Sequence, residues 1–159
     1  MAKSKFSIEN EGLKQLAKQI EELAGQNGLD RAVENSLTRT REYVTSEVEK
    51  AIASSKFNFN RTGKTKKTLI KNSKVEWNGT TATIKTGFKL RGEDGVNLTS
   101  IYLMYGTNPK NGKGIKPDSN LKNAAKGQGI HRDKINKIQQ EEFSKVIQEI
   151  MESGNDWYL

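Results

Sequence analysis

The sequence contains no cysteine and only one histidine, His131. Without cysteine the chain can form no disulfide bond, no thiolate zinc site and no cysteine nucleophile. One histidine cannot build a histidine metal cluster by itself, and a serine–histidine triad would have to centre on His131. Arg132 places a positive charge beside that ring, which disfavours the imidazolium that a general base becomes. We therefore expect no catalytic residue, no metal site, no cofactor and no enzyme activity.

Long apolar runs are missing as well. Hydrophobic residues make up 33% of the 159 residues, and no stretch approaches the roughly 20 apolar residues of a transmembrane helix. Because no apolar run follows the N-terminal Met1–Phe6, we expect no signal peptide and no membrane partner. The length favours a single domain over residues 1–159, with a thin core that oligomerisation would support.

Other motifs of chemistry are weak. Gly63-Lys64-Thr65 resembles the end of a phosphate-binding P-loop, but Asn58 stands where the full pattern requires glycine, so a polar turn is the better interpretation. The carboxylate pairs Glu21-Glu22 and Glu141-Glu142 fall on the apparent solvent faces of predicted helices, where charged residues are usual. Neither pattern indicates an active site.

Positive charge is what the chain has in excess. Its formal net charge is +8, which permits contact with nucleic acid or with an acidic protein surface, although solubility also favours a charge away from zero. Residues 56–74 hold seven lysines and arginines and no acid. Phe57 and Phe59 interleave with these cations, so bases could stack there while lysines hold phosphates; the alternative is a solvated basic loop. The candidate contacts with DNA or an acidic surface are Arg61, Lys64, Lys66 and Lys67.

The apolar spacing predicts helices near both ends. A first helix carries Leu13 to Ala24, Gly25–Gly28 ends or kinks it, and a second helix runs from about Asp30 to Ser54. A final helix is expected over about 133–153, with Asp133 complementing its N-terminal dipole. Its expected apolar stripe consists of Ile135, Ile138, Phe143, Val146, Ile147, Ile150 and Met151.

The middle of the chain reads as strands and loops. Asn78-Gly79 predicts a type I′ turn of a β-hairpin between residues 74–77 and 81–86. Residues 101–105 read as a buried strand, and residues 106–129 as a long basic, glycine-rich loop. The expected fold class is α+β, with two N-terminal helices and a C-terminal helix packed on a small antiparallel sheet, and with a long basic loop. We expect flexible ends at 1–10 and 154–159 and a mobile arm at 106–129.

A series of motifs occurs in a characteristic order. It opens with two helical motifs and continues with a T-G-x-L-x-x-S-I-like segment, a hairpin and an aromatic-rich strand that ends in Gly-Thr. It closes with a proline and a Leu-x-x-Ala element. These motifs are Leu13–Ala17, Asp30–Glu34, Thr62–Leu69, Tyr102–Thr107, Pro117 and Leu121–Ala124. In this order the chain resembles the tail-completion and head–tail joining proteins of siphophages, also known as neck or minor tail components. It departs from them at Thr65, Met104, Asn120 and Asn123.

The resemblance implies a structural protein of the bacteriophage or prophage virion, made in the cytoplasm of the bacterial host and placed at the tail or head–tail junction. Its partners would be other head-connector and tail proteins, further copies of itself in a ring, and packaged DNA through non-specific contact. Open strand edges and an ordering arm would supply the contacts. The residues of the expected assembly arm and its hinge are Tyr105, Gly106, Thr107, Pro117 and Leu121. The alternative is a small basic protein that binds nucleic acid non-specifically.

Overall fold

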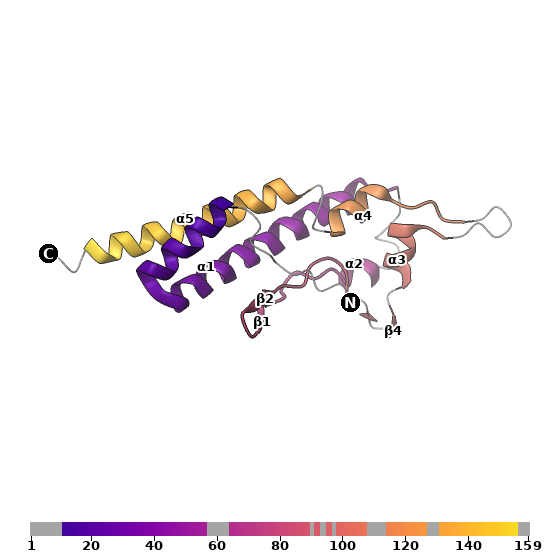
Figure 1. The fold of residues 1–159 in the computed structure, drawn as a ribbon. Coiled ribbons are helices and arrows are strands. Elements are labelled where there is room, and N and C mark those ends of the chain that lie inside the picture. The colour runs from indigo at the N-terminus through magenta and orange to yellow at the C-terminus, as the bar shows by residue number, and fades with distance from the viewer. Residues whose placement is uncertain are drawn as a thin grey trace. The chain divides into compact units, whose positions relative to one another are not determined.

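The computed structural model describes residues 11–56, 64–89, 91–92, 95–96, 98–107, 114–126 and 131–155. This part of the chain is mostly helical with small antiparallel strand pairs, so the α+β class is confirmed at that level. The elements in chain order are α1 (Glu11–Ser54), α2 (Lys64–Lys67), β1 (Glu76–Asn78), β2 (Thr81–Thr83), β3 (Arg91–Gly92), β4 (Gly95–Val96), α3 (Leu98–Tyr105), α4 (Ser119–Lys126) and α5 (Arg132–Asn155) (Figure 1).

The chain divides into two compact units. Unit 1 consists of Met1–Thr40, Lys74–Ile84 and Asp133–Leu159, and unit 2 consists of Arg41–Ser73 and Lys85–Arg132. The expectation of a single domain over 1–159 stays a prediction.

Unit 1 is built around a kink in α1. Gly25 has φ +68° and ψ −167°, which is not helical, and it separates two helical segments. A Cβ at this position would have no neighbouring atom within 4 Å, so the positive φ, and not crowding, is what requires glycine. Figure 1 shows the first segment of α1 turning back along the second. The predicted pair of N-terminal helices with a break at Gly25–Gly28 is therefore confirmed.

The core of unit 1 is helix on helix. Its buried cluster joins both segments of α1 to α5 and consists of Leu13, Ala17, Ile20, Ala32, Phe143, Val146 and Ile147. The predicted C-terminal helix is confirmed, and it extends to Asn155, so residues 154–155 are helical and not part of a flexible end. Met151 was expected in the apolar stripe but is 57% exposed. Met151 lies four residues after Ile147 and so on the same helical face, but it stands beyond the buried cluster, whose last member on α5 is Ile147.

Glu142 corrects a second expectation about α5. Its side chain is only 8% exposed, whereas the sequence placed it on a solvent face. Arg39 Nη1 lies 2.9 Å from Glu142 Oε1 and 3.2 Å from Glu141 Oε2. The hydrogen bond to Glu142 is the main reason why the pKa of Arg39 is raised above its ordinary value. A partner on α1, which sequence periodicity cannot show, lets this carboxylate be buried.

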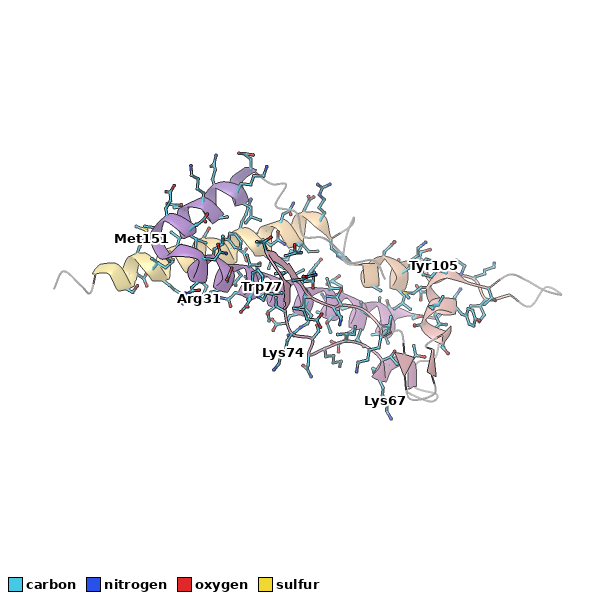
Figure 2. All side chains as sticks on the ribbon, turned by 60° about the horizontal axis from the view of Figure 1, so that its bottom comes forward. Arg31, Lys67, Lys74, Trp77, Tyr105 and Met151 are labelled. Atoms are coloured by element: carbon cyan, nitrogen blue, oxygen red, sulfur yellow. The ribbon has the colours of Figure 1, made fainter. Side chains whose placement is uncertain are left out.

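The predicted hairpin is present in unit 1. Strands β1 and β2 are antiparallel, with Trp77 opposite Ala82 and Asn78 opposite Thr81. The two-residue loop is thus Gly79-Thr80, one residue later than the Asn78-Gly79 turn that the sequence indicated, and Gly79 has φ +61°. Trp77 Nε1 donates a hydrogen bond of 2.7 Å to Glu34 of α1 (Figure 2), which attaches the hairpin to the helix.

In unit 2 the expected strand at 101–105 is wrong, because these residues belong to helix α3. Leu103 is buried, while Tyr102 and Tyr105 are exposed. The exposed tyrosines are three residues apart, which is the spacing of one helical face. A five-residue apolar run has no period of its own and suits either structure. Within the described residues no sheet of more than two strands is formed. In the described residues the strands form two separate antiparallel pairs, β1–β2 and β3–β4.

The expected arm at 106–129 also needs correction, because part of it is packed. It contains α4, in which Leu121 and Ala124 are 0% and 6% exposed. The Asp118 N–H donates to the Leu103 carbonyl at 2.8 Å, and Asp118 Oδ1 accepts the Leu121 N–H at 3.1 Å as an N-cap. The sequence did not predict this short amphipathic helix, because the segment around it is basic and rich in glycine. Residues 108–113 and 127–130, like 1–10, 57–63 and 156–159, lie outside the described residues.

Candidate functional site

Charge is divided unequally between the two units. Unit 2 contains 17 of the 27 lysines and arginines but 6 of the 19 acids, which gives it a formal charge of +11, whereas unit 1 has 10 basic and 13 acidic residues and a charge of −3. Like charges gathered in one unit raise the potential around it and attract anions or acidic surfaces. Unit 2 is therefore the unit better suited to bind an anion or an acidic surface.

The first candidate is an aromatic surface that consists of Tyr102, Tyr105 and Ile115. These side chains are 42%, 54% and 37% exposed. Tyr102 and Tyr105 lie three residues apart on α3 and so share one face of the helix. Lys122 of α4 places its Nζ 5.0 Å from the centroid of the Tyr105 ring, a cation–π contact that orients Tyr105 (Figure 2).

Gly106 fixes the base of this aromatic surface. It has φ +75°, and its N–H donates to the Tyr102 carbonyl at 2.8 Å, which is a left-handed cap at the end of α3. Two hydrogen bonds then join Thr107 to Ile115. The Thr107 N–H donates to the Ile115 carbonyl at 2.9 Å, and the Ile115 N–H donates to Thr107 Oγ1 at 2.8 Å. A Cβ on Gly106 would lie 2.9 Å from Pro117 Cδ. The segment expected to be a hinge is a packed junction.

The structure treats the expected arm residues differently. Tyr105 is exposed, and Gly106, Thr107 and Pro117 form the junction beneath it. Leu121 is fully buried in unit 2, so it belongs to the core and not to an exposed contact. Burial removes it from the candidate assembly residues, because a partner cannot reach it without unfolding α4.

The second candidate begins with a pairing between two basic segments of unit 2. The Ile70 N–H donates to the Gly87 carbonyl and the Lys89 N–H donates to the Thr68 carbonyl, both at 2.7 Å. Thr45 Oγ1 of α1 donates to the Ile70 carbonyl at 3.2 Å. Segment 68–70 is thereby held between α1 and segment 87–89.

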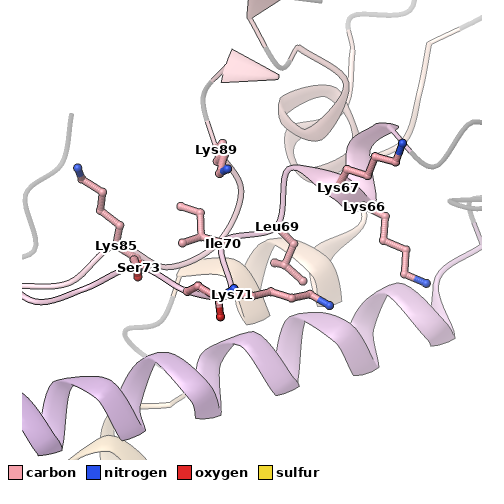
Figure 3. A pocket seen from close by; sticks show the side chains of 9 residues that line it. Lys66, Lys67, Leu69, Ile70, Lys71, Ser73, Lys85 and Lys89 are labelled. Carbon is pink, nitrogen blue, oxygen red and sulfur yellow. Dashed lines mark hydrogen bonds between the residues drawn. The ribbon is translucent and has the colours of Figure 1, made fainter. Parts of the chain in front are cut away.

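Lysines on and beside these two paired segments surround one open pocket of about 750 Å³ (Figure 3). We call it the lysine pocket, and its lysines are Lys66, Lys67, Lys71, Lys85 and Lys89. Leu69 and Ile70 lie between them, and the described residues that line the pocket include no carboxylate and no aromatic side chain. Lys71 Nζ lies 2.7 Å from Glu49 Oε1, so its charge is already compensated.

Two of the predicted basic contacts belong to the lysine pocket. Lys66 and Lys67 are exposed and line it. Lys64 begins α2, but its side chain, like all of Arg61, lies outside the described residues. The sequence did not indicate Lys85 and Lys89, because only the pairing of Leu69 with Phe88 brings them to the same place.

His131 is a third polar feature of unit 2. Its side chain is 6% exposed, and Nδ1 lies 2.9 Å from the Tyr43 hydroxyl. The rings meet edge to face, with centroids 5.3 Å apart. Burial is the main cause that raises the pKa of Tyr43. Within the described residues His131 Nε2 has no hydrogen-bond partner, and the Tyr43 contact is that of a packed pair.

Across the described ranges, no group of three or more histidine, aspartate or glutamate side chains is arranged to hold a metal ion. Among the helices of those same ranges, none has the length and apolar character needed to cross a bilayer. Comparison of the chain with models of known protein families, with curated proteins and with solved structures gave no match. A function is therefore inferred from the surfaces and residue patterns of the chain itself.

Proposed function

We propose that the chain is a non-enzymatic structural protein of a bacteriophage or prophage, which acts at the head–tail junction in tail completion or head–tail joining. It works by binding further copies of itself and neighbouring head-connector and tail proteins in the virion. The order of its motifs supports the proposal, because the whole series from Leu13–Ala17 to Leu121–Ala124 resembles that class of protein.

The observation that carries the proposal is the aromatic surface on α3. It coincides with the Tyr102–Thr107 motif, where the resemblance places an aromatic-rich strand ending in Gly-Thr, although residues 102–105 belong to helix α3 in this chain. Tyrosine is enriched at protein interfaces because it buries a large ring at a small cost in side-chain entropy. Here the Gly106 cap fixes the end of α3, and the Lys122 contact holds the Tyr105 ring, before any partner arrives. A preformed surface loses less entropy on binding than a flexible one.

The unequal charge supports contacts between unlike surfaces. A ring is closed by heterologous interfaces, in which one patch of a subunit meets a different patch of the next. A basic unit 2 at +11 and an acidic unit 1 at −3 are complementary in sign. In this proposal the described parts of the basic loop, residues 106–107 and 114–118, accompany the aromatic surface at the interface.

The test is removal of the gene from the phage or prophage genome that carries it. We expect heads and tails that are complete but unjoined by electron microscopy, and a large loss of infectious particles. The wild-type gene should restore joining, whereas Y102Q/Y105Q should not. The matched control L23Q/M151Q replaces exposed apolar residues of unit 1 and should restore it. Joined, infectious particles without the protein would contradict the proposal.

The lysine pocket favours a second candidate, the small non-specific nucleic-acid-binding protein. Such a protein would act as a monomer, and loss of its gene would leave heads and tails joined. The same deletion therefore separates the two candidates.

A further inference from the structure

We infer that the lysine pocket is a binding site for the phosphate backbone of double-stranded DNA. This inference does not depend on a place at a head–tail junction, because it rests on the composition and geometry of the pocket. It assigns the contact to Lys66, Lys67, Lys85 and Lys89, two of which come from outside the basic stretch 56–74.

The fold presents these lysines together. Lys66 and Lys67 belong to the short helix α2, whereas Lys85 and Lys89 lie on the segment that pairs with residues 68–70 (Figure 3). The paired backbone is tied to α1 by the Thr45 hydrogen bond and by a hydrogen bond from Arg41 to the Ser73 carbonyl. The backbone under the charges is thus fixed, and only the side chains are ordered on binding.

The lining residues point to phosphates and not to bases. Base stacking on a single strand requires aromatic side chains, and none is among the described residues that line the pocket. The described cations of the pocket are all lysines, which act as point charges and do not have the planar fork by which arginine reads guanine. A site of this kind binds any sequence through the charge of the duplex backbone.

Charge density favours DNA over an acidic polypeptide. Each lysine that neutralises a phosphate of duplex DNA releases condensed counterions, so every additional lysine adds to the affinity. A polypeptide with scattered carboxylates offers no comparable gain. Unit 2, with a formal charge of +11, carries far more charge than a few carboxylates would require.

Lys71 is expected to contribute less than Lys67. Its ammonium group already pairs with Glu49 at 2.7 Å, and DNA would have to compete with that carboxylate. This makes K71Q an internal comparison for K67Q, whose side chain is exposed.

The experiment measures binding of the full chain to a short duplex of mixed sequence by fluorescence anisotropy, at several salt concentrations. One variant, K66Q/K67Q/K85Q/K89Q, removes the charges of the pocket. The control, K18Q/K134Q/K137Q/K145Q, removes four exposed lysines of unit 1, so both variants fall from a net charge of +8 to +4. We expect the pocket variant to lose about tenfold or more in affinity and to flatten the slope of log K against log salt by about 3 to 4, at roughly 0.9 per phosphate contact. The control should keep the wild-type slope.

Equal losses in the two variants would overturn the inference, because net charge alone would then explain binding. Binding of poly-glutamate in preference to DNA would overturn it too and would indicate a protein partner. A second measurement needs no variant: acetylation of wild-type lysines with and without the duplex, read by mass spectrometry. Protection should appear at Lys67 and Lys89 and not at Lys134 and Lys137, and the reverse pattern would refute the site. Y102Q/Y105Q should bind DNA like wild type, so a failure of assembly and a failure of DNA binding are separable.

Discussion

Replacing Gly106 with alanine should destabilise unit 2 by about 2–4 kcal/mol. The added Cβ would lie 2.7 Å from the Ile115 carbonyl oxygen and 2.9 Å from Pro117 Cδ. The first of these neighbours is backbone and the second is a proline ring, and neither can turn aside as a flexible side chain can. The junction beneath the aromatic surface must therefore open to admit one methyl group.

The magnitude combines two costs and one gain. A left-handed conformation costs a non-glycine residue roughly 1–2 kcal/mol, and φ at Gly106 is +75°. Overpacking adds about 1–3 kcal/mol. Alanine restricts the unfolded chain, which returns about 0.4–1 kcal/mol.

Gly87 offers a matched control in the same unit. It also has a positive φ, +86°, but a Cβ there would meet its nearest atom, the Ala125 carbonyl oxygen, at 3.4 Å, an ordinary contact. G87A should therefore cost only about 1 kcal/mol, the backbone strain less the entropic gain.

Urea unfolding followed by circular dichroism gives the loss in the free energy of unfolding for both variants. Hydrogen exchange of peptides over residues 98–107 and 114–126 locates it. G106A should accelerate exchange in both peptides, since the junction joins them. Equal destabilisation by G106A and G87A would refute the reasoning, because conformational strain alone would then account for the effect.

Three further substitutions probe the cores. R39A should cost about 1–2 kcal/mol in unfolding free energy, because it leaves the buried Glu142 carboxylate without its partner, although Arg39 itself is 43% exposed. Y43F should cost about 1–2 kcal/mol, because it leaves His131 Nδ1 without the hydroxyl in a buried site. F143A should cost about 3–5 kcal/mol, because Phe143 is fully buried in the core of unit 1. Chemical denaturation monitored by circular dichroism measures all three.

Two of these substitutions, R39A and F143A, have a control. R31A removes the surface ion pair between Arg31 and Glu149 and should change stability by less than about 1 kcal/mol. A loss as large as that of R39A would contradict the importance of burying Glu142. M151A truncates an apolar side chain that is 57% exposed and should be nearly neutral, unlike F143A.

The long helices could be predicted from the sequence because the pattern that indicates a helix lies within the helix itself. Apolar residues recur at helical spacing through α1 and α5, and Gly25 marks the kink. The unbroken apolar run 101–105 carries no period, so the sequence does not distinguish a strand from a helix there. Only the structure, in which both tyrosines are exposed on one helical face, shows that the segment is a helix. The helix α4 was missed because it is short and lies in a glycine-rich, basic stretch.

The candidate surfaces were only partly accessible for a related reason. Tyr105 and Gly106 are adjacent in one motif, so the sequence alone shows that they lie close together. The lysine pocket depends on the pairing of Leu69 with Phe88, a contact between distant segments that no local pattern reveals. Glu142 shows the same limit, since its burial depends on Arg39 more than a hundred residues earlier.

The central claim is that the aromatic surface on α3 joins copies of this chain, and sedimentation velocity over a range of protein concentrations tests it most directly. We expect wild type to form larger species as concentration rises. Y102Q/Y105Q should need about tenfold or more protein to do so, in line with the loss of interface tyrosines. L23Q/M151Q should behave like wild type. A wild-type chain that stays monomeric at every concentration, or a tyrosine variant that assembles as readily as wild type, would contradict the claim.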